Sequence, residues 1–404
     1  MIKETLTNLN IKNINKKRIL LRADLNVPLE EGNITDDSRI KAILPTLEYL
    51  IKNQGKIIIF SHLGRVKEQK DKQKLSLKKI SEKLSYYLQK EVFFSPDTRG
   101  KDLEQKINNL LPGEVLLVEN TRFEDIESQK ESNNNSSLAK YWAYLGDVFI
   151  NDAFGTSHRA HSSNVGIATY INKKCFGFLV EKEINFLNKI MQNPKIPLVA
   201  VLGGSKVSDK IKIISRLLEK VDFLLIGGGM CFTFFKAQGL EIGKSLFEEN
   251  EIPLVKELLK SPKGKKIILP QDVVCGEEFS AQTKDIVCDY DKISPYLMGL
   301  DIGPKTVSLF KHYLLIAKTI VWNGPLGVFE FEKFSHGTYA IAEIINNLYE
   351  KATTIIGGGD SAAAVVKFGF KNNFSHISTG GGAFLEYLEG KEMPGLKCIE
   401  KIEI

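Results

Sequence analysis

The sequence contains few cysteines, and none of them is paired at a short spacing. The five are Cys175, Cys231, Cys275, Cys288 and Cys398, an odd number without any C-x-x-C pair. Disulfide frameworks use even numbers of cysteines and zinc sites use closely spaced pairs, so neither is expected here. The sequence therefore predicts free thiols in a reducing compartment.

Long apolar runs are also missing. No stretch approaches the ~18–20 consecutive apolar residues of a membrane helix. The first ten residues, Met1–Asn10, are polar and lack the apolar core of a signal peptide. We therefore expect a cytoplasmic protein without a membrane partner.

The charge pattern gives no sign of a nucleic-acid partner. The net charge is +6, from 55 Lys and Arg against 49 Asp and Glu. A nucleic-acid surface would need a basic stripe with interleaved aromatic residues, and the sequence has none. We interpret the excess as a lysine-rich composition.

Short apolar runs, in contrast, recur along the whole chain. In the first half they are Ile19–Val27, Lys56–Leu63, Val115–Asn120 and Val148–Ala153. In the second half they are Leu198–Leu202, Phe223–Ile226, Lys266–Leu269, Thr319–Trp322 and Thr353–Ile356. Amphipathic segments such as Leu77–Leu88 and Ile211–Val221 lie between them. Apolar strands that alternate with helices are typical of parallel sheets, and 404 residues are too many for one ordinary core. The prediction is an α/β protein with two sheets.

The boundary between the two domains is expected near residues 181–197. Val180–Met191 has a helical pattern, and the following Asn193–Pro197 contains two prolines that would end a helix. This places a first domain at 1–180 and a second at 198–390, with a hinge helix and linker between them. The Asn- and Ser-rich tract Asp125–Ser137 is interpreted as a surface loop.

Arginine and histidine cluster after the strands of the first half. In parallel sheets, ligands bind beyond the carboxyl ends of the strands, and arginine binds carboxylate and phosphate in a bidentate way that lysine cannot. The pattern indicates an anion pocket, although unrelated surface ion pairs are the alternative. The residues at these ends are Arg22, Asp24, Asn26, Arg39, His62, Arg65, Asn120, Arg122, Asn151, Asp152, His158, Arg159 and His161.

Glycine-rich turns follow the strands of the second half. They read GGSK at 203–206, GGG at 227–229, GGGDS at 357–361 and GGG at 380–382. Glycine lets backbone amides approach a phosphate, and Asp360 would suit a Mg²⁺–nucleotide. Lys206 and Lys210 are four residues apart at the start of a predicted helix, so both would project towards one anion. The alternative is that the glycines only make tight turns.

Two other nucleotide motifs are weaker. Residues 239–245 read GLEIGKS, but a P-loop needs glycine where Gln238 stands, and the segment follows a helical pattern. Residues 357–362 read GGGDSA, which fits a dinucleotide fingerprint, although no acidic residue follows Asp360 before Glu386. A NAD-dependent dehydrogenase therefore stays open as an alternative.

Ten segments in order resemble the phosphoglycerate kinase family. They are RADLNVP at 22–28, SHLGR at 61–65, ENTRF at 119–123, NDAFGTSHRAHSS at 151–163, GGSKVSDK at 203–210, GGGM at 227–230, MGLDIGP at 298–304, WNGPLGVFE at 322–330, GGGDS at 357–361 and STGGGA at 378–383. The departures are small: Ala23, Leu25, Ser162 and Ser361 stand where the family usually has Val, Phe, Ala and Thr. These four differences are expected to affect side-chain packing and not the activity.

The resemblance implies a fold and a reaction. The fold is two Rossmann-like three-layer (α/β/α) domains with parallel sheets, a hinge helix and a cleft, with residues 391–404 folding back onto the first domain. The first domain would bind 3-phosphoglycerate or 1,3-bisphosphoglycerate and the second Mg²⁺ with ADP or ATP, in a monomer that closes during transfer. A non-catalytic homologue with a binding role is a further alternative, yet every matched catalytic position is intact.

The resemblance also assigns residues to roles. Transfer would depend on Arg39, Lys206 and Lys210. The substrate would contact Asp24, Leu25, Asn26, Arg39, His62, Leu63, Gly64, Arg65, Arg122 and Arg159. The nucleotide would contact Gly203, Gly204, Lys206, Lys210, Gly228, Gly229, Gly299, Leu300, Asn323, Pro325, Val328, Glu330, Gly358, Gly359, Asp360 and Ser361. Gly381 and Gly382 would form a transition-state loop, and Asp360 would hold Mg²⁺ mainly through the nucleotide phosphates.

Overall fold

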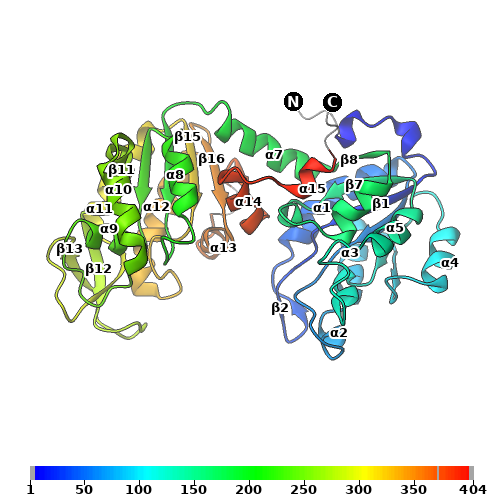
Figure 1. Ribbon diagram of the computed structural model, residues 1–404, viewed down its shortest axis with the longest axis horizontal. Helices are drawn as coiled ribbons and strands as arrows, with labels where there is room; N and C mark the ends of the chain where they lie inside the picture. The colour runs from blue at the N-terminus through cyan, green and yellow to red at the C-terminus, as the bar shows by residue number, and fades with distance from the viewer. Residues whose placement is uncertain (1–4, 371–372, 400–404) are drawn as a thin grey trace. The chain divides into compact units, whose positions relative to one another are not determined.

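The chain folds into two compact α/β units (Figure 1). The computed structural model describes residues 5–370 and 373–399. The first unit comprises the described residues up to Asn185 together with those from Glu392 onward, and the second is Phe186–Lys391. Within the described ranges, no helix is long and apolar enough to cross a membrane.

The first unit is built on a six-stranded parallel sheet. Its spatial order is β5-β6-β4-β1-β7-β8. The strands are β1 (Arg18–Ala23), β4 (Lys56–Phe60), β5 (Val92–Ser95), β6 (Val115–Val118), β7 (Val148–Asp152) and β8 (Lys174–Phe176). A short antiparallel pair, β2 (Leu29–Glu30) and β3 (Asn33–Ile34), follows β1.

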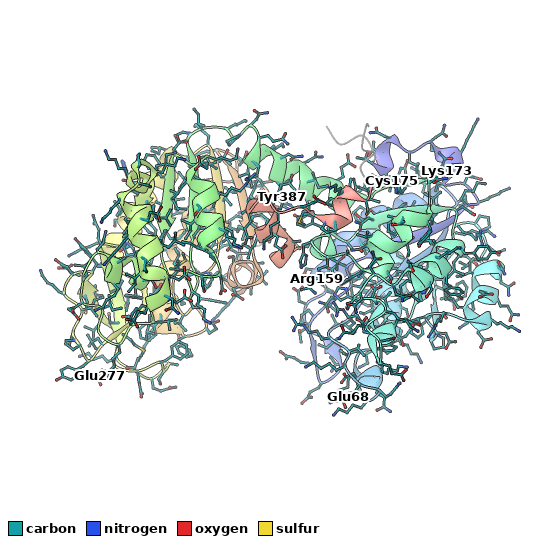
Figure 2. The ribbon with its side chains drawn as sticks, viewed as in Figure 1. Glu68, Arg159, Lys173, Cys175, Glu277 and Tyr387 are labelled. Carbon is teal, nitrogen blue, oxygen red and sulfur yellow. The ribbon has the colours of Figure 1, made fainter. Side chains whose placement is uncertain are left out.

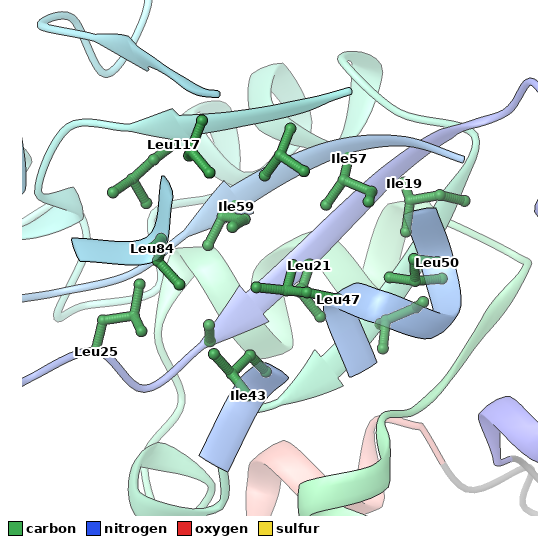
Figure 3. Packing of buried hydrophobic residues seen from close by; sticks show 14 of the residues in the cluster. Ile19, Leu21, Leu25, Ile43, Leu47, Leu50, Ile57, Ile59, Leu84 and Leu117 are labelled. Atoms are coloured by element: carbon green, nitrogen blue, oxygen red, sulfur yellow. The ribbon is translucent and has the colours of Figure 1, made fainter. Parts of the chain in front are cut away.

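Helices cover both faces of this sheet. They are α1 (Ser38–Lys52), α2 (Asp71–Lys74), α3 (Lys78–Leu88), α4 (Lys101–Asn109), α5 (Ser136–Tyr144), α6 (Ile167–Tyr170) and α15 (Pro394–Lys397). Successive side chains of a strand point to opposite faces. Ile57 and Ile59 of β4 pack into a core with α1 and α3 (Figure 3). On the other face, the Phe60 ring lies 5.3 Å from that of Trp142 in α5. The result is three layers.

The second unit repeats this plan and adds a small antiparallel sheet. Its parallel sheet has the order β11-β10-β9-β15-β16-β17, and the antiparallel one has the order β13-β12-β14. The strands are β9 (Leu198–Leu202), β10 (Phe223–Ile226), β11 (Ile267–Ile268), β12 (Asp272–Gly276), β13 (Ile286–Asp289), β14 (Met298–Ile302), β15 (Thr319–Asn323), β16 (Thr353–Gly357) and β17 (His376–Ile377). The helices are α8 (Ile211–Leu218), α9 (Cys231–Ala237), α10 (Ile252–Lys260), α11 (Pro304–Ile316), α12 (His336–Asn346), α13 (Gly359–Lys367) and α14 (Gly381–Leu388). Helix α7 (Phe178–Met191) crosses the boundary between the units at Asn185.

The α/β class and the two parallel sheets are confirmed, but the first strand is shorter than expected. β1 ends at Ala23 rather than Val27. Beyond it the backbone bonds to side chains: Leu25 N donates to Ser61 Oγ at 2.9 Å, and Asn26 N donates to Asp24 Oδ1 at 3.3 Å. Leu25 and Val27 are nevertheless buried. The apolar residues after Ala23 and up to Val27 are therefore buried without being part of a β-strand.

The tract interpreted as a surface loop is partly internal. The α5 helix begins at Ser136, inside the predicted loop Asp125–Ser137. The Glu131 side chain in this tract is completely buried. The interpretation of the whole tract as a surface loop was therefore wrong. A polar sequence did not show it because the burial depends on partners more than 30 residues away in the chain.

The helix predicted at Val180–Met191 is α7. Its first turn is held by the buried Asp152 at the end of β7, whose Oδ1 accepts from Val180 N at 3.0 Å.

Near the C-terminus, Gly395 N donates to Ser157 O at 2.8 Å, and Asn151 Nδ2 donates to Gly395 O at 2.7 Å. The described residues from Glu392 onward thus pack on the first unit, whereas 400–404 lie outside the described residues.

Candidate active site

Five arginines predicted from the sequence meet at the carboxyl edge of the first sheet. The pKa of the Arg122 guanidinium is lowered by burial and further by the positive charges of Arg159 and Arg65. The pKa of His62 lies well below its ordinary value because the imidazole is buried and faces Arg22, Arg122 and Arg39. Charges that act on one another in this way lie close together. The edge is therefore a strongly positive site.

Acidic and amide side chains hold this edge in place. Arg39 NH1 donates to both carboxylate oxygens of the buried Asp24, at 2.9 Å each. Asn26 Oδ1 accepts from Gly64 N at 2.7 Å, which ties the segment after β1 to the loop after β4. Asn120 after β6 makes two hydrogen bonds with the Leu63 backbone, at 3.2 and 2.8 Å. Neighbouring loops are thereby fixed to one another.

Two of the five arginines are exposed. Arg65 follows β4, and Arg159 lies in the segment after β7, where Figure 2 labels it. Arg159 Nε donates to His158 Nε2 at 2.9 Å. Arg22 is completely buried, and the Arg122 side chain is 12% exposed. The site thus combines buried positive charges, at Arg22 and Arg122, with exposed arginines that can contact a dissolved anion.

In the second unit, glycine-containing loops meet at the corresponding edge of the sheet. A Cβ on Gly203 would lie 2.0 Å from Pro325 O, so no other residue fits there without a backbone shift. Gly204 has a φ of +107°, and its N–H donates to Pro325 O at 2.8 Å. The loop after β10 joins them, because Gly228 N donates to Leu326 O at 3.1 Å.

The loop after β16 belongs to the same cluster. Asn323 Nδ2 donates to Gly357 O at 2.7 Å, and Gly324 N donates to Ser361 Oγ at 2.6 Å. Helices α13 and α14 start at Gly359 and Gly381, and a Cβ on Gly381 would lie 3.4 Å from Gly359 N. Two adjacent helix N-termini present backbone N–H groups and positive dipole ends, which suits phosphate groups.

Lys206 and Lys210 do not share a helix face. The α8 helix begins only at Ile211, so both lysines lie in the preceding turn. Lys210 Nζ points inward and donates to Gly203 O at 2.6 Å and to Asn323 O at 3.0 Å. Burial lowers the Lys210 pKa to about 8, while Asp360 and Asp209 oppose this shift. Lys206 is exposed. The expected pairing was wrong because the loop carbonyls need a buried donor.

A small hollow lies beside these loops, between β14 and α9. Gly228, Phe232 and Leu300 are among the residues that line it. Gly299 packs directly on Phe232, and Val328 N donates to Leu300 O at 2.8 Å. Eight of the residues predicted to contact the nucleotide lie in β14, at the end of β15 or in the loops after β10 and β15: Gly228, Gly229, Gly299, Leu300, Asn323, Pro325, Val328 and Glu330.

One of the two weaker nucleotide motifs takes the position expected of it. Residues 239–245 follow α9, a helix, as the rejection of a P-loop required. No group of three or more His, Cys, Asp or Glu side chains that could hold a metal ion occurs among the residues that the structure describes.

Three charged residues near these sites are buried, which was not predicted from the sequence. Arg22 and Glu131 lie in the first unit, and Asp301 lies in β14 of the second. Asp301 Oδ2 accepts from Gly337 N at 2.7 Å and Oδ1 accepts from Ile302 N at 2.9 Å. The position of a charged residue inside an apolar run, as in ILLRA and LDI, could have indicated the burial of Arg22 and Asp301. No such run surrounds Glu131, so its burial could not be predicted from the sequence.

Comparisons with known proteins agree with one another. A family model described as phosphoglycerate kinase matches residues 8–391. A phosphoglycerate kinase of Onion yellows phytoplasma is 66% identical over 399 residues, which cover 99% of this chain and 100% of the relative. One from Macrococcus caseolyticus is 55% identical over 399 residues, covering 99% of both.

Solved structures are similar over the same length. The phosphoglycerate kinase from Coxiella burnetii superposes with a TM-score of 0.87 at 41% identity and covers 98% of both chains. That from Pyrococcus horikoshii OT3 has a TM-score of 0.84 at 31% identity, again with 98% of both chains covered.

The buried Asp301 predicts how the stability of the second unit depends on pH. Burial raises its pKa from 3.8 to about 8. Between these values the native state holds a proton that the unfolded state has lost, so this group makes stability fall as pH rises. The expected loss is about 1.4 kcal/mol per pH unit between pH 5 and 7.

Urea unfolding of wild type and Asp301→Asn at pH 5, 6 and 7 measures this contribution. Trp142 and Trp322 lie in different units, so a Trp142→Phe background makes the fluorescence report the second unit. The wild-type advantage over Asp301→Asn should shrink by nearly 3 kcal/mol across this range, that is about two pH units at 1.4 kcal/mol each. Parallel pH curves would contradict the raised pKa.

Proposed function

The chain belongs to the phosphoglycerate kinase family, and we propose that it transfers a phosphoryl group reversibly from 1,3-bisphosphoglycerate to ADP, giving 3-phosphoglycerate and ATP. One observation carries the proposal beyond family membership. A cluster of five arginines ends one sheet, and glycine loops with two helix N-termini end the other. The first suits a small acid that carries phosphate, and the second suits a nucleotide.

We assign the glycerate to the first of these edges. Arg65, Arg122 and Arg159 offer guanidinium groups that suit a phosphate, and His62 and Arg39 would hold the carboxylate end. Asp24 and Asn26 already fix Arg39 and the loop at Gly64 through hydrogen bonds. Their contribution to binding would therefore be partly to hold the cationic residues in position.

We assign the nucleotide to the second edge. The N-termini of α13 and α14 and the loop at Gly203–Lys206 would receive the phosphates, and the segments around Leu300 and Val328 the adenosine. Mg²⁺ commonly binds through one or two carboxylates together with substrate phosphates. Asp360 is exposed in the first turn of α13, which fits a metal held mainly by the nucleotide. When bound, the metal would neutralise charge on these phosphates.

The chemistry needs no acid–base residue from the protein. The nucleophile is either a carboxylate, which is ionised at neutral pH, or a terminal phosphate oxygen of ADP. Transfer passes through a loose transition state with negative charge on the equatorial oxygens, so positioning and cations supply the catalysis. We propose that Arg39 and Lys206 stabilise the transferred group. Lys210, held on the loop carbonyls, would assist by fixing the loop that receives the phosphates.

The two half-sites belong to different units, so we propose that the units close about residues 181–197 during each cycle. Closure would bring the substrates together and exclude water, which limits hydrolysis of ATP. Small-angle scattering should show a smaller radius of gyration with 3-phosphoglycerate and the nucleotide bound together than with either alone. An equal radius in all three states would argue against closure.

We also infer that the protein works as a cytoplasmic monomer. All five cysteines are free thiols, as a reducing compartment requires. Sedimentation at micromolar concentration tests the oligomeric state.

One assay tests the reaction as a whole. Formation of ATP is measured from 1,3-bisphosphoglycerate and ADP, with NAD binding measured in parallel. Turnover at typical enzyme rates supports the proposal. Binding of NAD without ADP would point to a dehydrogenase, and an absence of turnover with both substrates bound would point to a non-catalytic homologue.

Replacing Arg39 should abolish most of the turnover. By analogy with arginine groups that stabilise phosphoryl transfer, Arg39→Ala is expected to lower kcat by about 10³-fold or more. The matched control is Arg18→Ala, because Arg18 lies at the opposite end of the same sheet, paired with Asp147 at 3.0 Å. A near-normal kcat for Arg39→Ala would remove it from the catalytic machinery.

Replacing Lys206 should affect turnover more than nucleotide affinity. An interaction made mainly in the transition state lowers kcat, whereas one made equally in the ground state raises KM. Lys206→Ala is therefore expected to reduce kcat by at least about tenfold with a smaller change in the KM for ATP. Lys212→Ala, an exposed lysine on α8, serves as the control. A pure KM effect would contradict the assigned role.

A further inference from the structure

A chain of buried polar groups lies behind His62. It consists of Arg22, Ser163 and Glu131, all of them 0% exposed, while His62 itself is 8% exposed. Arg22 comes from β1, Ser163 from the segment after β7, and Glu131 from the tract before α5. Burial of two opposite charges is costly unless they are paired and hydrogen-bonded, and here Ser163 links them through hydrogen bonds.

The contact between Arg22 and His62 decides where the imidazole carries its proton. Arg22 NH2 lies 3.2 Å from His62 Nδ1. A guanidinium is a donor only and stays protonated in proteins, so Nδ1 must be the acceptor. The pKa of His62 is well below its ordinary value because of burial and the positive charges of Arg22, Arg122 and Arg39. The imidazole is thus neutral, with its proton on Nε2.

Arg22 is itself fixed by Ser163. Arg22 Nε donates to Ser163 Oγ at 2.8 Å, and its NH1 donates to Ala23 O. The single hydroxyl proton of Ser163 is donated to Glu131 Oε1, and Ser163 N donates to Glu131 Oε2 at 2.9 Å. Because this proton is committed to Glu131, the hydroxyl oxygen can only accept from Arg22. Each hydrogen bond between Glu131 and His62 therefore has a fixed donor: Ser163 donates to Glu131, and Arg22 donates to both Ser163 and His62.

Glu131 also supplies the charge that Arg22 needs. Burial raises the pKa of Glu131, while Arg22 and the two Ser163 donors oppose this rise. His161 Nδ1 lies 3.9 Å from Glu131 Oε1, but burial and nearby positive charges lower the His161 pKa to about 3. A neutral His161 adds no positive charge at pH 7. The carboxylate of Glu131 is thus matched to the Arg22 guanidinium.

We propose that Glu131 is a positioning residue that acts through Ser163 and Arg22 to hold His62 as the Nε2–H tautomer. In this form the imidazole offers the substrate a hydrogen-bond donor at every pH near neutrality. The opposite tautomer would turn a lone pair towards an anion and repel it. The identity of that anion, 3-phosphoglycerate, rests on the proposed function, but the tautomer does not.

The experiment interrupts this series of hydrogen bonds at Ser163 and measures the tautomer of His62 directly. The ¹⁵N shifts of the imidazoles are recorded on the free protein, which has six histidines, and His62 is assigned by comparison with His62→Gln. Ser163→Ala removes the link, and Glu131→Gln removes the charge in a second variant. The matched control is Ser162→Ala, because the buried Ser162 Oγ donates to Lys130 O at 2.8 Å and not to this chain. Ser163→Thr restores a hydroxyl.

Wild type should show His62 with Nε2 protonated only, whereas Ser163→Ala and Glu131→Gln should show a mixture of tautomers. Both variants should raise the KM for 3-phosphoglycerate about tenfold, equivalent to about 1.4 kcal/mol, with the KM for ATP within twofold of wild type. Ser162→Ala should match wild type, and Ser163→Thr should recover most of the loss.

An unchanged His62 tautomer in Ser163→Ala and in Glu131→Gln would overturn the proposal. Equal increases in both KM values would also overturn it, since they would indicate a general loss of structure. If the wild type lacked kinase activity, the proposed function would fail, while the ¹⁵N spectra would still decide whether Glu131 controls His62.

Discussion

Repulsion between like charges at the carboxyl edge of the first sheet is the constraint on which the first unit depends. The guanidinium groups of Arg22, Arg39 and Arg122 all act on His62, and those of Arg22 and Arg122 act on each other. Each has a specific acidic partner: Asp24 binds Arg39 at 2.9 Å, Asp125 lies 3.8 Å from Arg122, and Glu131 reaches Arg22 through Ser163. These partners offset part of the repulsion within the cluster.

The acidic partners do not neutralise all of the positive charge at this edge, and the remaining charge would favour the binding of an anion. Arg65 and Arg159 are exposed, and their charges still lower the pKa of Arg122. Positive charges concentrated at one edge raise the local concentration of an anion and strengthen its contacts. A substrate with a carboxylate and a phosphate would therefore relieve repulsion that the free protein retains.

The second unit, to which we assign the nucleotide, uses backbone groups in place of arginines. A nucleotide offers many phosphate oxygens, and backbone N–H groups can bind them only if loops approach closely. Gly203 allows a contact with Pro325 O that any side chain would block, and Lys210 holds the two carbonyls that converge on it. The glycines and the buried lysine are thus parts of one arrangement.

The sequence by itself determined the fold class, the number of parallel sheets and the family, because apolar period, strand-end residues and motif order are local properties of the chain. It also placed Arg39, His62, Arg122 and Arg159 at one edge, since parallel strands share their carboxyl ends. It missed the antiparallel sheet of β12, β13 and β14, whose short strands lack a strong apolar run.

Only the tertiary structure decided what depends on partners distant in sequence. It turned Lys210 inward, ended β1 at Ala23 and buried Glu131 in a tract that looks like solvent-exposed loop. The Nε2–H form of His62 belongs to this group as well, because it requires Arg22, 40 residues away, and Ser163, 141 residues from Arg22, to meet in one buried chain. The physical reason is that a buried charge is defined by what surrounds it, and a sequence read along its length cannot show those surroundings.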